Sequence, residues 1–514
     1  MSFDAYRSDL TIGIVGAGVM GRGIAQVAAE AGITVLLADA KAGAADEART
    51  FCAGMINRKV AKGTLSSDAG AATIARIQNT NAGPETGYDS FRSCHLVIEA
   101  AVERLDIKHA ILAGLEAEVA DDCIIATNTS SLSVTGFAAK ARIPERIAGF
   151  HFFNPVPLMK VVEVIGGVLT GPQVLDGLAE LAGRIGHHPV RVTDTPGFLV
   201  NHAGRAYSTE ALRIVQEGIA SFADVDRVMT EAAGFRMGPF ELFDLTGLDV
   251  SHAVIESIYR QYHEEPRYRP VQITAQRHAA GLFGRKTGRG FYTYVDAKAQ
   301  KPAEPQVPAI DLAGVSVWVS NRRIEAASVV KTVVTSAGAG LENGPVPSEN
   351  ALIVVTPFGE DATTTAIAEN LDPTRTIAID CLFGPDKRRT IMGTPITRPD
   401  VLNTAHALFA ANGNRVTIIG DSPGFIAQRM VAAIVNIGAD IAQQRIASPA
   451  DINKAVELGL GYPHGPLALG DHHGPRRILE ILEAMQTFYG DPRYRPSPWL
   501  KRRAQLGVSL TACQ

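Results

Sequence analysis

A histidine and a glutamate lie in two successive apolar segments of the chain. His151 stands in RIAGFHFF (146–153) and Glu163 in KVVEVI (160–165). Removing a proton from an alcohol needs a base, and histidine is the side chain whose unperturbed pKa lies closest to neutral pH. A carboxylate on the second ring nitrogen would fix the tautomer and stabilise the imidazolium that forms. His151 alone could equally be a core histidine, but an unpaired Glu163 inside an apolar strand would be costly to bury.

Hydroxyl and amide side chains follow the neighbouring apolar segments. Ser130 lies in NTSS after the run CIIATN, Asn154 lies in HFFNP, and Asn201 closes DTPGFLVN. Such donors can hold a substrate oxygen while its charge changes. Each also has an ordinary interpretation, because serine often caps a helix and asparagine is common at a helix start. Since ligands of open α/β sheets bind beyond the carboxyl ends of the strands, we expect these groups to converge there.

A glycine-rich turn near the N-terminus could hold a dinucleotide. The motif is Gly16-Ala17-Gly18-Val19-Met20-Gly21, between an apolar strand and a helical stretch. Gly16 permits the tight turn, Gly18 lets the backbone approach a pyrophosphate, and Gly21 allows the helix to pack closely on the strand. Asp39 ends the second strand, where a carboxylate bonds the ribose and disfavours NADP, although Lys41 is nearby. We therefore predict NAD; a flavin, or a turn without ligand, is the alternative.

These residues must be positioned by an alternating α/β domain. The apolar runs TIGIVG, ITVLLAD, LVIEAAV, CIIATN, RIAGFHFF and KVVEVI are interleaved with helical stretches over residues 8–193. This order predicts a Rossmann-like doubly wound sheet. Residues 194–294 are helical in pattern, and Ser221 and Asp224 have the spacing of a helix N-terminus. Residues 295–313 lack periodicity and are interpreted as a linker.

The helical domain is repeated. DTPGF (194–198) returns as DSPGF (421–425), GPFELFD returns as GPLALGD, and EPRYRP returns as DPRYRP. Alignment of residues 194–247 with 421–474 gives 18 identities in 54 positions. Residues 421–514 are therefore predicted to be a second helical copy. Residues 314–420 contain strand-like runs without a glycine motif, and we interpret them as a small, degenerate α/β unit.

Composition excludes few classes but favours an ordinary globular protein. The 514 residues carry a net charge of −4, which gives no general reason to expect nucleic acid or an anionic membrane as a partner. The five cysteines show no CxxC spacing and favour a reducing cytoplasm over a secreted, disulfide-linked chain; they are Cys52, Cys94, Cys123, Cys381 and Cys513. We expect no signal peptide, membrane span or metal site.

Residues 10–294 resemble the L-3-hydroxyacyl-CoA dehydrogenases over essentially the full length of that family. The matching segments are IGIVGAGVMGRGIA, VIEAAVERLDIK, TNTSSL, HFFNPVPLMKVVEV, DTPGFLVN, GPFELFDLTGLD and GRKTGRGFY. The resemblance implies a catalytic base at His151 with Glu163 as its partner, and substrate-oxygen contacts at Ser130 and Asn201. Asn154 matches a further active-site position. Cofactor contacts are implied for Glu103, Lys108, Asn154 and Lys286.

The resemblance also suggests the substrate. It would be an acyl-CoA thioester, whose phosphates could meet Lys59 and Lys62, although these lysines could equally form a solvated helix face. The length and repeat resemble the long bacterial forms associated with phenylacetate breakdown, which act on 3-hydroxyadipyl-CoA; 3-hydroxybutyryl-CoA enzymes are close relatives. No pocket residue separates these two substrates.

The second half departs from the active pattern. Gln428 stands where Asn201 stands in the first copy, and no HFFNP segment precedes DSPGF. A second active site is therefore not expected. The second helical copy could instead replace a dimer partner, giving a monomeric pseudo-dimer; a homo-oligomer is the alternative. Two other functions remain open: another hydroxy-acid dehydrogenase, or an NAD(H)-binding structural or regulatory protein.

Overall fold

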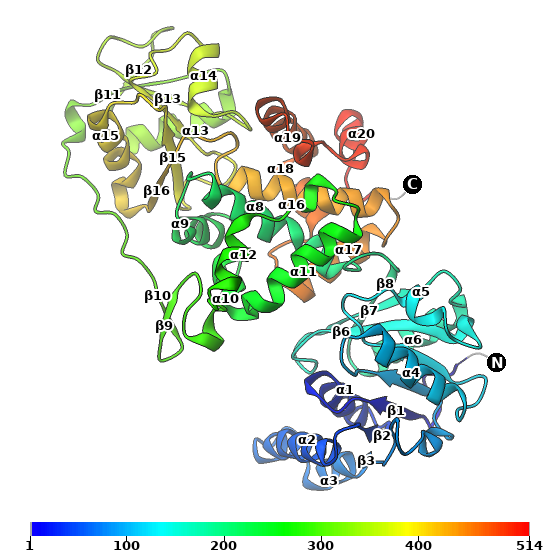
Figure 1. Ribbon diagram of the computed structural model, residues 1–514. Coiled ribbons are helices and arrows are strands. Elements are labelled where there is room, and N and C mark those ends of the chain that lie inside the picture. Colours follow the sequence, from blue (N-terminus) through cyan, green and yellow to red (C-terminus); the bar gives the residue numbers. More distant parts are fainter. Residues whose placement is uncertain (1–2, 513–514) are drawn as a thin grey trace. The chain divides into compact units, whose positions relative to one another are not determined.

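The computed structural model of the chain describes residues 3–512 (Figure 1). These residues divide into two compact units. One joins the chain up to His202 with Gln444–Leu460, and the other joins Ala203–Gln443 with the residues from Gly461 onward. The division does not follow the consecutive domains expected from the sequence, because a short segment of the second helical copy belongs with the first sheet.

The first unit is built on an eight-stranded sheet. Its strand order is β3-β2-β1-β4-β5-β6-β7-β8, and every neighbouring pair is parallel except β6 and β7. The strands are β1 (Thr11–Val15), β2 (Thr34–Ala38), β3 (Ile77–Asn79), β4 (Leu96–Glu99), β5 (Ile124–Thr127), β6 (Ile147–Phe152), β7 (Val161–Gly166) and β8 (His188–Thr193). The helices are α1 (Val19–Glu30), α2 (Ala44–Ala61), α3 (Ser67–Ala75), α4 (Leu105–Glu116), α5 (Val134–Ala138), α6 (Pro172–Arg184), α7 (Val200–Ala203) and α17 (Pro449–Leu460).

Both faces of this sheet are covered, which explains why its strands read as continuous apolar runs. Ile14 of β1 belongs to the core on one face, together with residues of α1 and α6. Its neighbour Val15 belongs to the core on the other face, with Leu112 of α4. The doubly wound sheet predicted from these runs is confirmed.

The second unit contains a smaller sheet with the order β12-β11-β13-β14-β15-β16. The strands of this unit are β9 (Thr293–Val295), β10 (Lys298–Gln300), β11 (Ser316–Val319), β12 (Gly340–Glu342), β13 (Leu352–Val355), β14 (Thr376–Ile379), β15 (Arg389–Gly393) and β16 (Val416–Ile419). β14 and β15 are antiparallel and β15 and β16 are parallel, as are β6–β7 and β7–β8 in the first sheet. The helices are α8 (Arg205–Gln216), α9 (Phe222–Arg227), α10 (Pro239–Thr246), α11 (Leu248–Gln261), α12 (Gln272–Ala279), α13 (Ile324–Ser336), α14 (Ala362–Ala368), α15 (Pro399–Ala410), α16 (Ala427–Gln443), α18 (Pro466–His473), α19 (Pro475–Tyr489) and α20 (Pro498–Leu506).

One aspartate in each copy shows which strands of the two sheets correspond. The Asp194 carboxylate accepts the backbone N–H groups of Val134 and Thr135 at the start of α5. The Asp421 carboxylate accepts those of Ala362 and Thr363 at the start of α14. β13 therefore corresponds to β5, and the small sheet lacks counterparts of β3 and β4. It is a shortened copy of the first sheet.

The predicted linker, residues 295–313, is only partly irregular. At its start Lys298–Gln300 pairs with Thr293–Val295 as an antiparallel hairpin, which was not predicted from the sequence. Asp296 and Ala297 both adopt positive φ (48° and 61°). Two such residues form the tight turn whose twist matches a hairpin, and the missing hydrophobic alternation hid this from the sequence.

The predicted helix start at Ser221 is confirmed. Its hydroxyl accepts the N–H of Asp224, and α9 begins at Phe222. The Ser448 hydroxyl accepts the N–H of Asp451 in the same way at the start of α17. The cysteines Cys52, Cys94, Cys123 and Cys381 are free thiols, and Cys513 lies outside the described residues. Within residues 3–512, no helix has the length and hydropathy needed to span a membrane.

Candidate active site

His151 and Glu163 face each other across β6 and β7. The two strands are antiparallel, and these residues are direct partners in the register. His151 Nδ1 lies 2.6 Å from Glu163 Oε2, and both side chains are buried. The carboxylate therefore fixes the Nδ1 proton and leaves Nε2 to accept a proton from a substrate. Phe153 and Phe198 flank the imidazole, with ring centroids 4.5 and 5.8 Å away.

The second oxygen of Glu163 is held by the backbone. Glu163 Oε1 accepts the N–H groups of Leu199 (3.0 Å) and Val200 (2.8 Å). These amides point at the carboxylate because the DTPGF turn reverses the chain through positive φ at Gly197 and Phe198 (75° and 49°). Asn201 is the next residue along, in the first turn of α7. The turn thus links the carboxylate to a predicted substrate contact.

Glu103 organises the loop that follows β5. Its Oε1 accepts hydrogen bonds from Thr129 Oγ1 (2.7 Å) and from the backbone N–H groups of Ser130 (2.9 Å) and Ser131 (3.0 Å). Burial alone would raise the pKa of Glu103, but these hydrogen bonds and the charge of Lys108 outweigh it and lower the pKa. Glu103 is therefore an anion that holds Ser130 at the carboxyl end of β5, beside the strand that carries His151.

Lys108 is buried beneath this loop rather than exposed to a ligand. Its ammonium lies 2.7 and 2.8 Å from the two carboxylate oxygens of Glu99 and 3.4 Å from Glu103. A lysine with this burial is tolerated because its charge is paired. The structure places it behind the predicted cofactor contact Glu103.

Sequence reasoning missed two residues that support the site. Glu99, at the end of β4, bonds Lys108 and accepts a hydrogen bond from Thr127 (2.7 Å). Asn128 Oδ1 accepts the N–H of Phe152 (2.8 Å) and so ties the end of β5 to the strand of His151. The signal for Glu99 was present, because it is an ionisable residue in the otherwise apolar run LVIEAAV. Asn128 opens the polar segment NTSS that follows β5, but sequence reasoning assigned a role only to Ser130 in that segment.

The glycine turn fits a dinucleotide pyrophosphate. A Cβ on Gly16 would lie 2.5 Å from the carbonyl oxygen of Ala100, and one on Gly21 only 1.8 Å from that of Gly16. A Cβ on Gly18 would meet nothing within 4 Å, so its backbone faces open space at the N-terminus of α1. Val19, the first residue of α1, is half exposed. The first and third glycines thus shape the turn, and the second leaves room for a ligand.

Asp39 lies at the end of β2 beside this turn. Its Oδ2 accepts the N–H of Ala17 (2.7 Å) and its Oδ1 accepts the N–H of Lys41 (2.8 Å). These bonds fix the carboxylate next to the glycine turn, where its charge would repel the extra phosphate of NADP. The residues fit NAD.

The remaining predicted contacts are less distinctive. Lys59 pairs with Glu30 (2.7 Å), which weakens its suitability for a phosphate, and Lys62 is exposed at the end of α2. Asn154 is exposed in the loop after β6. Lys286 belongs to the second unit, where it pairs with Asp249.

The second sheet has other residues in the places of His151 and Glu163. Gly420 matches Thr193, since each directly precedes the aspartate described above, and the registers of β15 and β16 then place Thr390 where Glu163 stands. The backbone N–H of Asp380 bonds the carbonyl of Thr390, so Asp380 occupies the place of His151. Val134 and Ala362 begin α5 and α14, so Phe358, four residues before Ala362, stands where Ser130 stands before Val134. The expectation of no second active site stays a prediction, which these replacements favour.

Comparison with known proteins supports the family resemblance found in the sequence and extends it to the second half of the chain. The model of the 3-hydroxyacyl-CoA dehydrogenase NAD-binding domain matches residues 11–195, and that of the C-terminal domain matches residues 197–294 and 424–510. The chain is 36% identical over 496 residues to the 3-hydroxyadipyl-CoA dehydrogenase of Escherichia coli K12, covering 96% of this chain and 98% of that protein. It belongs to the 3-hydroxyacyl-CoA dehydrogenase family. The family's activity is NAD-dependent, and this chain is an oxidoreductase of that kind.

Solved structures extend the match to the whole fold. The crystal structure of 3-hydroxybutyryl-CoA dehydrogenase from E. coli K12 matches with a TM-score of 0.85 at 35% identity, over 97% of this chain and 98% of that one. The human mitochondrial hydroxyacyl-coenzyme A dehydrogenase is 38% identical over 283 residues, which are 55% of this chain and 90% of that protein. The family therefore includes chains that match only the first half of this one and a chain that matches both halves.

Proposed function

We propose that the chain interconverts (S)-3-hydroxyacyl-CoA and 3-oxoacyl-CoA with 3-hydroxyadipyl-CoA as its principal substrate and 3-hydroxybutyryl-CoA as the second candidate. The relatives that match over nearly the full length, including the second repeat, carry these two substrate names. Such an enzyme would serve the breakdown of aromatic or fatty acids. The observation that carries the proposal is the His151–Glu163 pair, with its second carboxylate oxygen fixed by two backbone amides.

The chemistry follows from what these groups can do. His151 Nε2 takes the proton of the 3-hydroxyl group while the hydride leaves C3, and Glu163 stabilises the imidazolium. Ser130 and Asn201 hold the 3-oxygen as it becomes a carbonyl oxygen. NAD, held by the glycine turn and Asp39, supplies the hydride acceptor when bound. In the reverse direction His151 returns the proton to the 3-oxygen.

The first experiment measures NADH absorbance with purified protein, NADH and acetoacetyl-CoA. Oxidation of NADH by the wild type, with a loss of about 10²- to 10⁴-fold in His151→Ala, is the expected result. Comparison of 3-hydroxyadipyl-CoA with 3-hydroxybutyryl-CoA in the forward direction then tests the acyl group. NADH binding without turnover on any of these thioesters would contradict the proposal and favour an NAD(H)-binding protein.

We infer that one chain is a monomeric pseudo-dimer. In the second unit, α8 of the first helical copy packs on α16 of the second. The two PRY turns bond reciprocally, Arg267 Nη2 to the carbonyl of Arg495 (2.9 Å) and Arg493 Nη2 to that of Arg269 (2.7 Å). A mass of one chain, 54.6 kDa, in sedimentation is the expected result.

For the location of the protein we propose the cytoplasm, which its free thiols favour.

A further inference from the structure

Residues 444–460 come from the second helical copy, yet they lie in the unit that holds His151 and Glu163. α17 packs on β7 and β8. Just before it, the carbonyl of Ile446 accepts the N–H of Thr193 (3.0 Å) at the end of β8. Near its C-terminal end, Gly459 lies against Val200: a Cβ on Gly459 would be 3.0 and 3.2 Å from the two methyl carbons of that valine.

These contacts hold the turn that carries the two amides of Glu163. Thr193 directly precedes the DTPGF segment, and Val200 follows it and donates its N–H to Glu163 Oε1. The same absent Cβ would lie 3.6 Å from Val161, which is on the same face of β7 as Glu163. The second helical copy therefore contacts the turn at both ends and the catalytic strand beside it.

We propose that residues 444–460 are a positioning element for the active site: by fixing Thr193 and Val200 they hold the Glu163 carboxylate, and through it His151, in the geometry for proton transfer. This proposal rests on the proposed function. Gly459 is the positioning residue, because a side chain there would bring its Cβ within 3.0 Å of Val200 and push α17 and Val200 apart.

Each helical copy contacts the sheet of the other copy, but only the first sheet carries the residues proposed for catalysis. In the second unit the carbonyl of Ile219 accepts the N–H of Gly420 (2.8 Å), and the π-helical segment Val228–Ala232 packs on β15. There the places of Glu163 and His151 hold Thr390 and Asp380, so no base needs to be positioned. The second half is thus required by the first sheet although it has other residues in the places of His151 and Glu163.

The test enlarges Gly459 in the full-length chain. Gly459→Val should lower kcat about tenfold to hundredfold, because small displacements of catalytic groups have effects of this size. KM for NADH should stay within about twofold, since the glycine turn is untouched. Gly183→Val in α6, where a Cβ meets nothing within 4 Å, is the matched control and should behave as wild type.

Rescue separates positioning from general damage. Gly459→Ala should lower kcat less than Gly459→Val does. Val200→Ala added to Gly459→Ala should restore much of the loss, because it removes the methyl carbons that the new Cβ meets and keeps the backbone N–H. A double variant no better than Gly459→Ala alone would contradict the proposal.

Hydrogen exchange gives a measurement that needs no turnover. In Gly459→Val the amides of Leu199 and Val200 should exchange about tenfold faster or more, while those of β1 stay protected. Unchanged protection of both amides, with wild-type kcat, would overturn the inference. If the wild type reduces no 3-oxoacyl-CoA, the proposed function fails, and the exchange rates still decide whether α17 holds the turn.

Discussion

At the scale of single residues, both carboxylate oxygens of Glu163 have hydrogen-bond partners. One oxygen bonds His151 and the other accepts two backbone amides, so each oxygen acts as an acceptor. An amide in its place has only one acceptor atom. Such a site depends on the ionised carboxylate and not only on a polar side chain of the same size.

Glu163→Gln should therefore lower kcat by about 10³-fold while NADH still binds. If the amide oxygen stays with Leu199 and Val200, the NH₂ group faces His151 and forces the opposite tautomer, with the proton on Nε2. Steady-state kinetics and NADH titration of the same preparation check this result. A variant with more than about a third of wild-type kcat would show that Glu163 does not set the tautomer.

Asp380, which occupies the place of His151 in the second copy, lowers the stability of the folded chain at neutral pH. Burial raises its pKa to about 6, although hydrogen bonds from Gln428 and Leu382 oppose the shift. Between pH 4 and 6 the folded chain keeps a proton that the unfolded chain has released. The stability from this group is full below the unfolded pKa of about 4 and is lost as the pH rises through 6.

Asp380→Asn should remove this loss. Both donors bond Oδ1, so the amide oxygen can accept both and no charge remains. The variant should be more stable than wild type by up to about 3 kcal/mol at pH 7.5 and indistinguishable near pH 4. Urea unfolding at both pH values checks this, with the exposed Asp122→Asn as a control for loss of a charge. A variant less stable at pH 7.5 would mean that the ionised carboxylate is needed.

At the scale of elements, the second and third glycines of the turn have different roles. Gly21 packs α1 on the strand, whereas Gly18 faces open space. Gly21→Ala should lower both the unfolding temperature and NADH affinity, because its Cβ meets the Gly16 carbonyl. Gly18→Ala should keep the unfolding temperature and weaken NADH binding about tenfold or more, since its methyl group lies where the pyrophosphate approaches. Thermal unfolding and NADH fluorescence titration distinguish them; equal unfolding temperatures for both would refute the division.

The elements of the first sheet could be predicted because burial on both faces leaves continuous apolar runs. Glu163 stood out for the same reason, as a charge inside such a run. The place of Asp380 could not be predicted, because it depends on strand register, and no sequence motif marks it. Nor could the position of α17: a repeat shows that a helix is present twice but not on which sheet each copy packs. The burial of Lys108 depends on Glu99, a partner that only the folded chain reveals.

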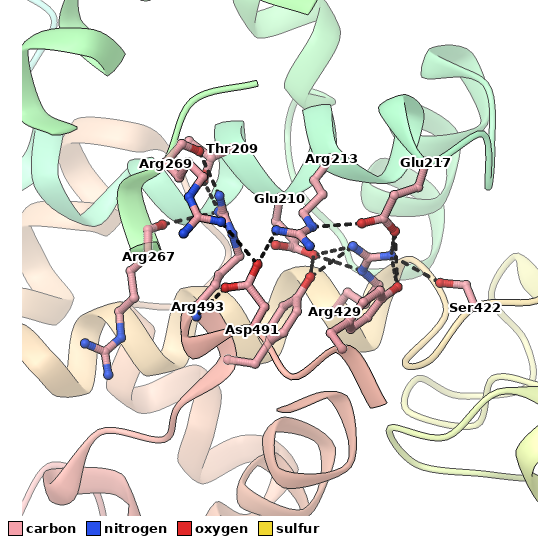
Figure 2. A network of polar contacts seen from close by, with 12 residues as sticks. Thr209, Glu210, Arg213, Glu217, Arg267, Arg269, Ser422, Arg429, Asp491 and Arg493 are labelled. Atoms are coloured by element: carbon pink, nitrogen blue, oxygen red, sulfur yellow. Dashed lines mark hydrogen bonds and ion pairs between the residues drawn. The ribbon is translucent and has the colours of Figure 1, made fainter. Parts of the chain in front are cut away.

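At the scale of the whole molecule, a buried charged network joins the two helical copies (Figure 2). Arg429 of α16 is fully buried and bonds Glu210 of α8, with Nε–Oε1 and Nη2–Oε1 distances of 2.8 and 2.7 Å. It also bonds Glu217 (2.8 Å) and the hydroxyl of Tyr494 (3.1 Å). Since the partners come from both copies, this network connects the two helical copies to each other.

Removing one member should therefore cost more than removing the central pair. Arg429→Met leaves the buried Glu210 carboxylate without its guanidinium, and we expect a loss of about 3–5 kcal/mol in the free energy of unfolding. Adding Glu210→Gln removes the stranded charge and should recover part of that loss, because a neutral amide is less costly to bury. Denaturant unfolding of both single variants and the double variant gives the coupling. If the losses of the two single variants add up to that of the double variant, Arg429 and Glu210 do not stabilise each other. Apolar packing would then hold the two helical copies together.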